Sequence, residues 1–184
     1  MVLVWILAAL VVLIALAFVY YYNRFVVLEN RIDNALSQID VQLRKRADLV
    51  PSLVKTVKGY AKHEKEIMKS VTEARKQLLA QKELKGKIKA NNQLQQALKS
   101  IFALAENYPQ LKANENFLQL QQELANIEDR IAYARQYYND AILAYNNLVE
   151  RFPGVMFAKL YNKKEREYLE IPQEARAVPK IDFD

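Results

Sequence analysis

FLQLQQELANIEDRIAYARQYYNDAILAYNNLVERF, residues 117–152, is the stretch that decides the fold. Apolar side chains recur in it at alternating steps of three and four residues over five heptads. This period places them on one face of an α-helix and excludes a β-strand, in which each face repeats every two residues. We therefore predict a long amphipathic helix over 114–151. The apolar stripe consists of Phe117, Leu120, Leu124, Ile127, Ile131, Ala134, Tyr138, Ala141, Tyr145, Leu148 and Phe152.

Three shorter stripes of the same period precede this one in the chain. Each stripe predicts one more amphipathic helix. The predicted helices cover residues 23–47, 50–83 and 90–108. Amphipathic helices joined by short links pack as a bundle, so we predict an all-α fold. In full, it is an N-terminal transmembrane helix that continues into an antiparallel up-and-down four-helix bundle with long helices, followed by a short C-terminal helix and an extended tail.

Proline and glycine mark the expected helix boundaries. Pro51 cannot donate a backbone hydrogen bond and disfavours helical geometry at Val50, so we place a turn there. A single helix kinked at Pro51 is the alternative. Gly86, which stands among lysines, marks the next link, and Pro109 marks the one after it. Pro153, followed by glycine, closes the long helix.

Composition excludes most catalytic chemistries. The 184 residues carry a net charge of +6, with no cysteine, three glycines and one histidine. Without cysteine there is no disulfide framework and no thiolate zinc site, and one histidine cannot supply a metallopeptidase His pair. Three glycines are too few for a turn-rich β-barrel. His63 with Glu64 is best explained as a polar pair on the surface of the helix at 50–83 or against a neighbouring helix. We therefore predict no catalytic residue, no metal and no cofactor.

The first 22 residues carry no charged side chain. As a helix they span about 33 Å, enough for a hydrocarbon core of about 30 Å. A cleaved signal peptide is the alternative, because Ala15–Ala17 resembles a cleavage site, but no basic region precedes the apolar run. Basic residues follow the run, beginning with Arg24 and Arg31. The positive-inside rule then places the N-terminus outside and the C-terminal domain in the cytoplasm.

Three segments follow from these observations: a transmembrane anchor at 1–22, a helical bundle at 23–152, and a short apolar helix with an extended tail at 153–184. Three groups of residues suit a membrane interface: the aromatic residues at both ends of the anchor, the lysines at an expected end of the bundle, and the C-terminal apolar patch. The assignment of the lysines depends on the helix predicted over 50–83, whose 34 residues would run back toward the membrane and bring the lysines to the bilayer. The residues assigned to the interface are Trp5, Tyr20, Tyr21, Tyr22, Arg24, Lys82, Lys85, Lys87, Lys89, Phe157, Leu160 and Tyr161.

A Tyr-Asn pair occurs twice in the long helix, at 138–139 and again at 145–146. Seven residues separate the two pairs, so both lie on the same helix face. Polar residues at the edge of a core must be hydrogen-bonded, and they can fix the register of a bundle. We favour this structural role over a ligand site. The expected polar register residues are Gln38, Asp40, Gln42, Asn139 and Asn146.

The chain after the anchor resembles the LemA family. The resemblance covers nearly all of it, in family order, and departs at Leu36, where tryptophan is usual, and at Tyr161-Asn162, where a Gly-Phe pair is common. It implies an N-terminally anchored helical bundle with an exterior N-terminus. The motifs that carry it include Ser37–Leu43, Asp48–Pro51, Val57–Ala61, Leu111–Asn114, Tyr138-Asn139, Tyr145-Asn146, Phe152-Pro153, Pro179-Lys180 and Asp182-Phe183.

Together these features predict a membrane-anchored helical scaffold that self-associates and organises or shapes membrane. The alternative is an adaptor or accessory subunit on the cytoplasmic side for a membrane enzyme such as a metallopeptidase. Residues 24–90 hold 16 basic and 8 acidic side chains, so anionic lipid headgroups are the expected partner, and nucleic acid is not expected. Other expected partners are a second copy of the chain and another membrane protein.

Overall fold

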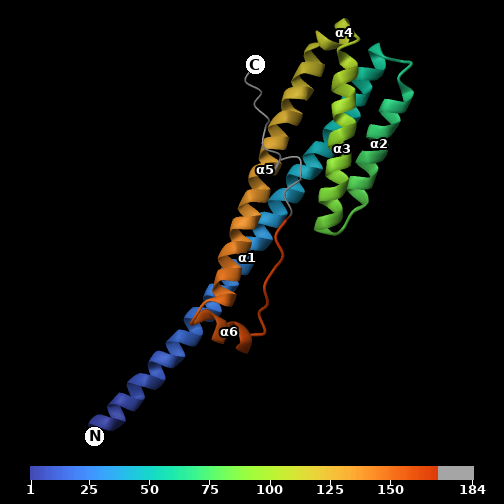
Figure 1. Ribbon diagram of the computed structural model, residues 1–184. Coiled ribbons are helices and arrows are strands. Elements are labelled where there is room, and N and C mark those ends of the chain that lie inside the picture. Colours follow the sequence, from blue (N-terminus) through green and yellow to red (C-terminus); the bar gives the residue numbers. More distant parts are fainter. Residues whose placement is uncertain (170–184) are drawn as a thin grey trace, which may run out of the picture. The chain divides into compact units, whose positions relative to one another are not determined.

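The computed structural model describes residues 1–169, and within them the chain forms six helices and no strand. The all-α prediction is confirmed. Pro172, Pro179 and the rest of the expected extended tail lie outside the described residues. The helices, shown in Figure 1, are α1 (Val2–Tyr60), α2 (Lys65–Ala80), α3 (Leu84–Ala105), α4 (Pro109–Lys112), α5 (Glu115–Glu150) and α6 (Gly154–Leu160).

The chain divides into two compact units, and the boundary crosses both long helices. We call residues 36–135 the central unit, and residues 1–35 with the chain from 136 onward the terminal unit. In the central unit the second half of α1 and the first half of α5 join α2 and α3. The chain reverses direction at each link, giving the expected up-and-down order of four helices (Figure 1).

The predicted helix boundary at Pro51 is wrong, because α1 continues through this residue to Tyr60. Proline has no N–H, so the carbonyl of Ala47, four residues earlier, loses its usual intrahelical donor. Arg75 on α2 supplies the missing hydrogen bond, since its Nε donates to the Ala47 carbonyl at 2.8 Å. A contact 28 residues away in sequence thus satisfies the backbone group that Pro51 leaves unpaired.

The true break after α1 lies at residues 61–64, where His63 sits exposed in the turn. As a result α2 has 16 residues, or about 24 Å, instead of the 34 residues and roughly 51 Å expected. The length argument that brought the lysines near Gly86 to the bilayer therefore fails. Gly86 is also not in a link: α2 and α3 are joined by residues 81–83, and Gly86 lies in the first turn of α3.

The core of the central unit contains one buried charge. Arg46 on α1 is 3% exposed; it forms an ion pair with Glu128 on α5 and donates to Asn91 Oδ1 on α3 at 2.9 Å. Burial lowers the pKa of Arg46, and the nearby Glu128 carboxylate partly opposes this shift. The buried apolar side chains of the same unit include Leu43, Val50, Leu53, Val57, Leu94, Ile101, Phe117, Leu124 and Ile131.

In the terminal unit the second half of α5 supplies buried residues together with the part of α1 that follows the apolar run. Phe25 and Leu28 on α1 and Ile142 and Tyr145 on α5 are almost fully buried. Phe152, the last member of the predicted stripe, lies beyond the end of α5 and is 80% exposed. The stripe therefore ends one turn earlier than the sequence pattern indicated.

The turn from α5 into α6 depends on a glycine. A Cβ atom at Gly154 would lie 2.2 Å from the backbone oxygen of Leu148. Because that contact is with backbone, a side chain at this position would displace the helix that follows. Gly154 thus allows α6 to begin directly against the end of α5.

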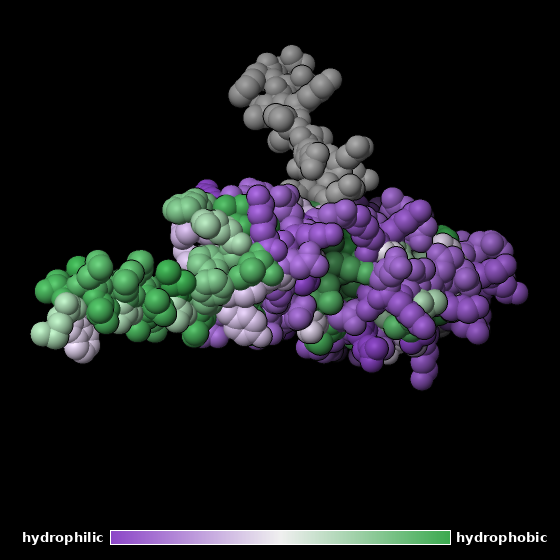
Figure 2. Space-filling view, turned by 90° about the horizontal axis from the view of Figure 1, so that it is seen from below, coloured by the Kyte–Doolittle hydropathy of each residue, from purple (hydrophilic) through white to green (hydrophobic). Residues whose placement is uncertain are grey.

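The first part of α1 is the one described helix that is long and apolar enough to cross a membrane. None of its most apolar window is buried against the rest of the structure. Figure 2 shows this run as the continuous hydrophobic surface at the left of the view. The prediction of a helix that could span a bilayer is confirmed in this sense.

Candidate interaction site

The candidate site lies in the terminal unit, where residues 161–169 leave α6 and run in extended form; we call them the strap. The reversal at the end of α6 is a Schellman motif. Asn162 adopts φ = 52°, Asn162 N–H donates to Lys159 O at 3.3 Å, and Lys163 N–H donates to Ala158 O at 2.8 Å. Asparagine tolerates this left-handed conformation better than most residues, so it can take the place of glycine at this turn.

Two asparagines of α5 hold the backbone of the strap. Asn146 Nδ2 donates to the carbonyl of Arg166 and Asn146 Oδ1 accepts from the Arg166 N–H, both at 2.9 Å. Asn139 makes the same pair of bonds with Leu169, at 3.1 and 2.9 Å. Each side-chain amide therefore satisfies both the donor and the acceptor of one strap residue.

The spacing of the two asparagines matches that of their targets. Seven residues of α-helix rise about 10.5 Å. Three residues of extended chain, from Arg166 to Leu169, cover about 10 Å. Since the higher-numbered asparagine binds the lower-numbered strap residue, the strap runs antiparallel to α5. The repeated Tyr-Asn pair is thus a two-step ladder for an extended backbone.

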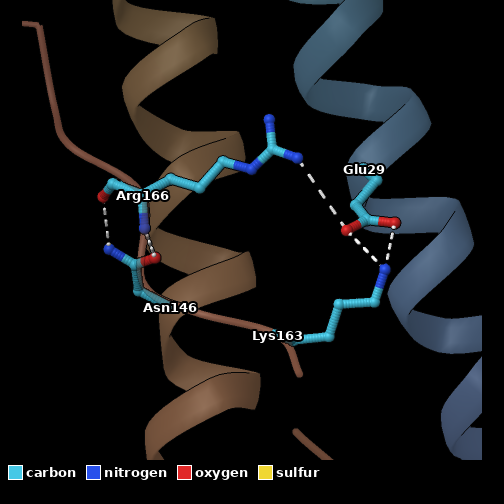
Figure 3. A network of polar contacts seen from close by, with 4 residues as sticks. All are labelled: Glu29, Asn146, Lys163 and Arg166. Atoms are coloured by element: carbon cyan, nitrogen blue, oxygen red, sulfur yellow. Dashed lines mark hydrogen bonds and ion pairs between the residues drawn. The ribbon is translucent and has the colours of Figure 1, made fainter. Parts of the chain in front are cut away.

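A carboxylate on α1 binds the cations of the strap. Glu29 accepts hydrogen bonds from Lys163 Nζ at 2.8 and 2.9 Å, and Arg166 Nη2 lies 3.8 Å from the same carboxylate (Figure 3). The Arg166 guanidinium also lies over the ring of Tyr145, 5.6 Å from its centroid. Burial raises the pKa of Tyr145, and Glu29 adds to this, whereas Arg166 and Lys163 act against it.

An aromatic cluster fixes α6 to α1 at the end of the apolar run. The Phe157 ring stacks on Tyr21 with centroids 4.3 Å apart and meets Phe18 edge-on at 5.2 Å. Tyr161 Oη donates to the carbonyl of Phe18 at 3.1 Å, and its ring meets Tyr22 edge-on. Four aromatic residues that were assigned to the membrane interface from the sequence are therefore brought into contact here.

The other side of α6 is apolar and exposed. Met156 is 62% exposed and Leu160 is 60% exposed, and Phe152 precedes them at the same four-residue spacing. Residues four apart share one face of a helix, so Met156 and Leu160 lie together on α6. The helix thus presents one apolar face to α1 and a second apolar face to its surroundings.

The remaining residues expected at the membrane lie on separate elements. Trp5 and Tyr20 are exposed on α1, as is Arg24. Lys82 lies in the link before α3. On α3 itself, Lys87 pairs with Asp40. Lys85 and Lys89 also lie on α3.

The expected polar register residues are divided between the two units. Gln38, Asp40 and Gln42 belong to the central unit, whereas Asn139 and Asn146 belong to the terminal unit. Asp40 pairs with Lys87 on α3, and Gln42 Oε1 is buried without a hydrogen-bond partner.

Sequence reasoning missed three residues of this site: Glu29, Lys163 and Arg166. No motif connects them, because the partners are 134 and 20 residues apart in the chain. The signal that could have indicated the site was the heptad spacing of the Tyr-Asn pairs.

The contacts of the site are hydrogen bonds and ion pairs that hold an extended segment. Among residues 1–169 no cluster of three or more His, Cys, Asp or Glu could hold a metal ion. Glu64, the neighbour of His63, accepts a hydrogen bond from Tyr108 Oη at 3.1 Å, which raises the pKa of that tyrosine. What the geometry can do is bind an extended backbone that carries two cations.

Sequence comparisons agree with the resemblance noted above. The LemA family model matches residues 35–183. The chain is 25% identical over 173 residues to the magnetosome protein MamQ of Magnetospirillum gryphiswaldense, covering 80% of this chain and 64% of that protein. It is equally similar to two MamQ proteins of Paramagnetospirillum magneticum. It is also 28% identical over 131 residues to protein LemA of Metamycoplasma hominis, covering 67% of this chain and 57% of that protein.

The chain thus spans less than two thirds of the length of these relatives. The match to the family model covers most of the chain and includes both units. The sequence-based family prediction is confirmed, and the chain belongs to the LemA family.

Proposed function

We propose that this protein is a membrane-anchored, non-catalytic scaffold that self-associates and organises membrane. The observation that supports this most directly is the position of α6. Its aromatic side packs on residues 18–25 of α1, where the apolar run ends, and its other side is apolar and exposed.

If the apolar run crosses the bilayer, α6 lies at the level where the run enters water. Met156, Leu160 and the nearby Phe152 then meet the acyl-chain boundary. Full burial of a side chain of this size is worth about 1.5–3 kcal/mol. Lys159 is exposed on the same helix, and each basic residue near an anionic surface adds about 1 kcal/mol. A lipid surface rich in anionic headgroups is therefore the partner we propose.

Single-cysteine labelling tests the position of α6, because the chain has no native cysteine. The full chain is reconstituted in vesicles containing anionic lipid, and an environment-sensitive dye is attached at Met156→Cys or Leu160→Cys. We expect quenching by lipids that carry a quencher near the headgroup. Glu165→Cys, on the exposed side of the strap, is the matched control and should stay unquenched. Equal, solvent-like signals at all three positions would reject the proposed membrane contact of α6.

We propose that the N-terminus lies outside the cell and the strap in the cytoplasm, on the basis of the basic residues that follow the anchor. In intact cells a membrane-impermeant thiol reagent should label Val2→Cys. The same reagent should label Glu165→Cys only after the membrane is opened. The reverse pattern would invert the topology.

The self-association part of the proposal is tested by size in mild detergent. The purified wild-type chain should form homo-oligomers over a range of concentrations. A strict monomer that assembles only with another polypeptide would instead favour an adaptor for a membrane enzyme.

A further inference from the structure

We propose that the strap of one copy occupies the binding site for the strap on a second copy of the chain. The site consists of Glu29, Asn139 and Asn146, and we call it the clamp. This inference rests on the proposed self-association and specifies the contact that produces it. Its ligand is an extended, dicationic segment, and the occupant is residues 163–169 of another copy.

The clamp recognises backbone more than side chains. All four hydrogen bonds of the asparagines go to the N–H and C=O groups of Arg166 and Leu169. Any extended chain presents these groups at the same intervals. Binding of this kind does not depend on whether the backbone comes from the same copy or from another.

Glu29 selects the strap over other extended segments. It binds Lys163 at hydrogen-bond distance and lies 3.8 Å from Arg166, so it faces two cations that stand three residues apart on the strap. The strap of a second copy carries the same cations at the same spacing. It therefore offers the same partners to Glu29, Asn139 and Asn146, which an unrelated peptide does only by coincidence.

The strap can leave the clamp without unfolding of the helices. Residues 164–168 are exposed, and Leu169 is the one buried residue of the strap. Segments with few buried apolar contacts open locally at a fraction of the free energy of global unfolding. The aromatic contacts of Phe157 hold α6 on α1, so the strap can open alone by a change in the turn at Asn162.

Anchoring in one membrane favours exchange between copies. The clamp and the strap both belong to the terminal unit, which also contains the apolar run of α1. Two anchored copies therefore present the clamp and the strap at the same height above the bilayer. Confinement of this kind raises the effective concentration of each for the other, and exchange of an identical element is a low-cost route to association.

Two complementary variants test the exchange by zero-length cross-linking. A carbodiimide joins a carboxylate directly to an amine in contact with it, as Glu29 and Lys163 are. The full-length variants Glu29→Gln and Lys163→Gln, with different tags, are co-expressed and treated in the membrane. Neither chain can form the Glu29–Lys163 amide by itself. We expect a covalent dimer whose cross-linked peptides join Glu29 of one variant to Lys163 of the other.

Two controls accompany the experiment. The wild-type chain shows that the reagent reaches the pair. A pair in which both chains carry Lys163→Gln retains the neighbouring Lys164 and should yield no cross-link to Glu29.

The outcomes separate this inference from the proposed function. If the two tagged variants co-purify and the wild type cross-links, but no Glu29–Lys163 amide joins the variants, then strap exchange is refuted while self-association stands. If the variants do not co-purify at all, both ideas fail.

Discussion

The central and terminal units both use polar contacts to join distant parts of the chain, but they use different partners. In the central unit, Arg46 and Arg75 connect one helix to another. In the terminal unit, Asn139 and Asn146 connect a helix to an extended segment. The first arrangement joins helix to helix, and the second holds an extended segment against a helix.

This difference indicates which contacts could be exchanged between two copies of the chain. The Arg46 group needs a carboxylate and an amide at particular positions on α5 and α3, so it fixes the register of one bundle. The asparagine ladder needs defined residues on α5 only, because it binds backbone. Contacts of the central unit should therefore control global stability, whereas contacts of the terminal unit should control local opening.

The largest expected effect follows from leaving Arg46 buried without its counter-ion. Glu128→Leu should reduce the free energy of unfolding by about 3 kcal/mol, since breaking a buried pair from one side leaves an uncompensated charge. Chemical denaturation of the full chain in detergent measures this loss. Adding Arg46→Met to the variant should recover much of the stability. A loss that persists in the double variant would show that the charge pair is not its cause.

The next effect tests how α1 passes Pro51. Arg75→Met removes the donor to the Ala47 carbonyl and should cost about 1–3 kcal/mol, the penalty for an unsatisfied buried acceptor. Pro51→Ala restores the backbone N–H, so in that background Arg75→Met should cost much less. A double-mutant cycle on thermal unfolding measures the coupling. Equal costs in both backgrounds would mean that Arg75 acts independently of the proline.

A smaller and local effect is expected in the terminal unit. Asn139→Ala or Asn146→Ala removes two hydrogen bonds to the strap and should lower its local stability by about 1–2 kcal/mol. Hydrogen exchange should show faster exchange of the Arg166 and Leu169 amides, with the central unit unchanged. Asn147→Ala, one residue further on α5, is the matched control. Faster global unfolding or lost protection in the central unit would erase the distinction between the two units.

The smallest effect is a pH dependence. Because burial raises the pKa of Tyr145, the folded state keeps its proton at a pH where the unfolded state releases it. The resulting stability is complete below about pH 10 and is lost as the pH rises toward the folded-state pKa. Denaturation at increasing pH should show a shallower loss for Tyr145→Phe than for wild type. Tyr133→Phe, at an exposed position, is the control, and identical slopes in all three proteins would contradict the prediction.

The helical period of the apolar residues predicted those features that depend only on neighbouring residues within one helix. The long helix predicted over 114–151 is α5 at Glu115–Glu150, and the apolar run became the exposed start of α1. The repeated asparagines at positions 139 and 146 were also evident from the sequence, but the strap backbone that they bind was not. A side-chain amide that binds backbone does not require a particular residue type at the position it binds. The residue types of Arg166 and Leu169 therefore did not indicate this contact.

The sequence by itself determined the helical class, the membrane-length apolar run and the family, because each depends on the order of residue types along the chain. Only the tertiary structure decided that α1 passes through Pro51 and that the strap lies on α5. In both cases the deciding group is a backbone donor or acceptor, at Ala47, Arg166 or Leu169, satisfied by a side chain at least 20 residues away. Every residue carries such backbone groups, so no residue pattern reveals which of them a distant side chain will bind.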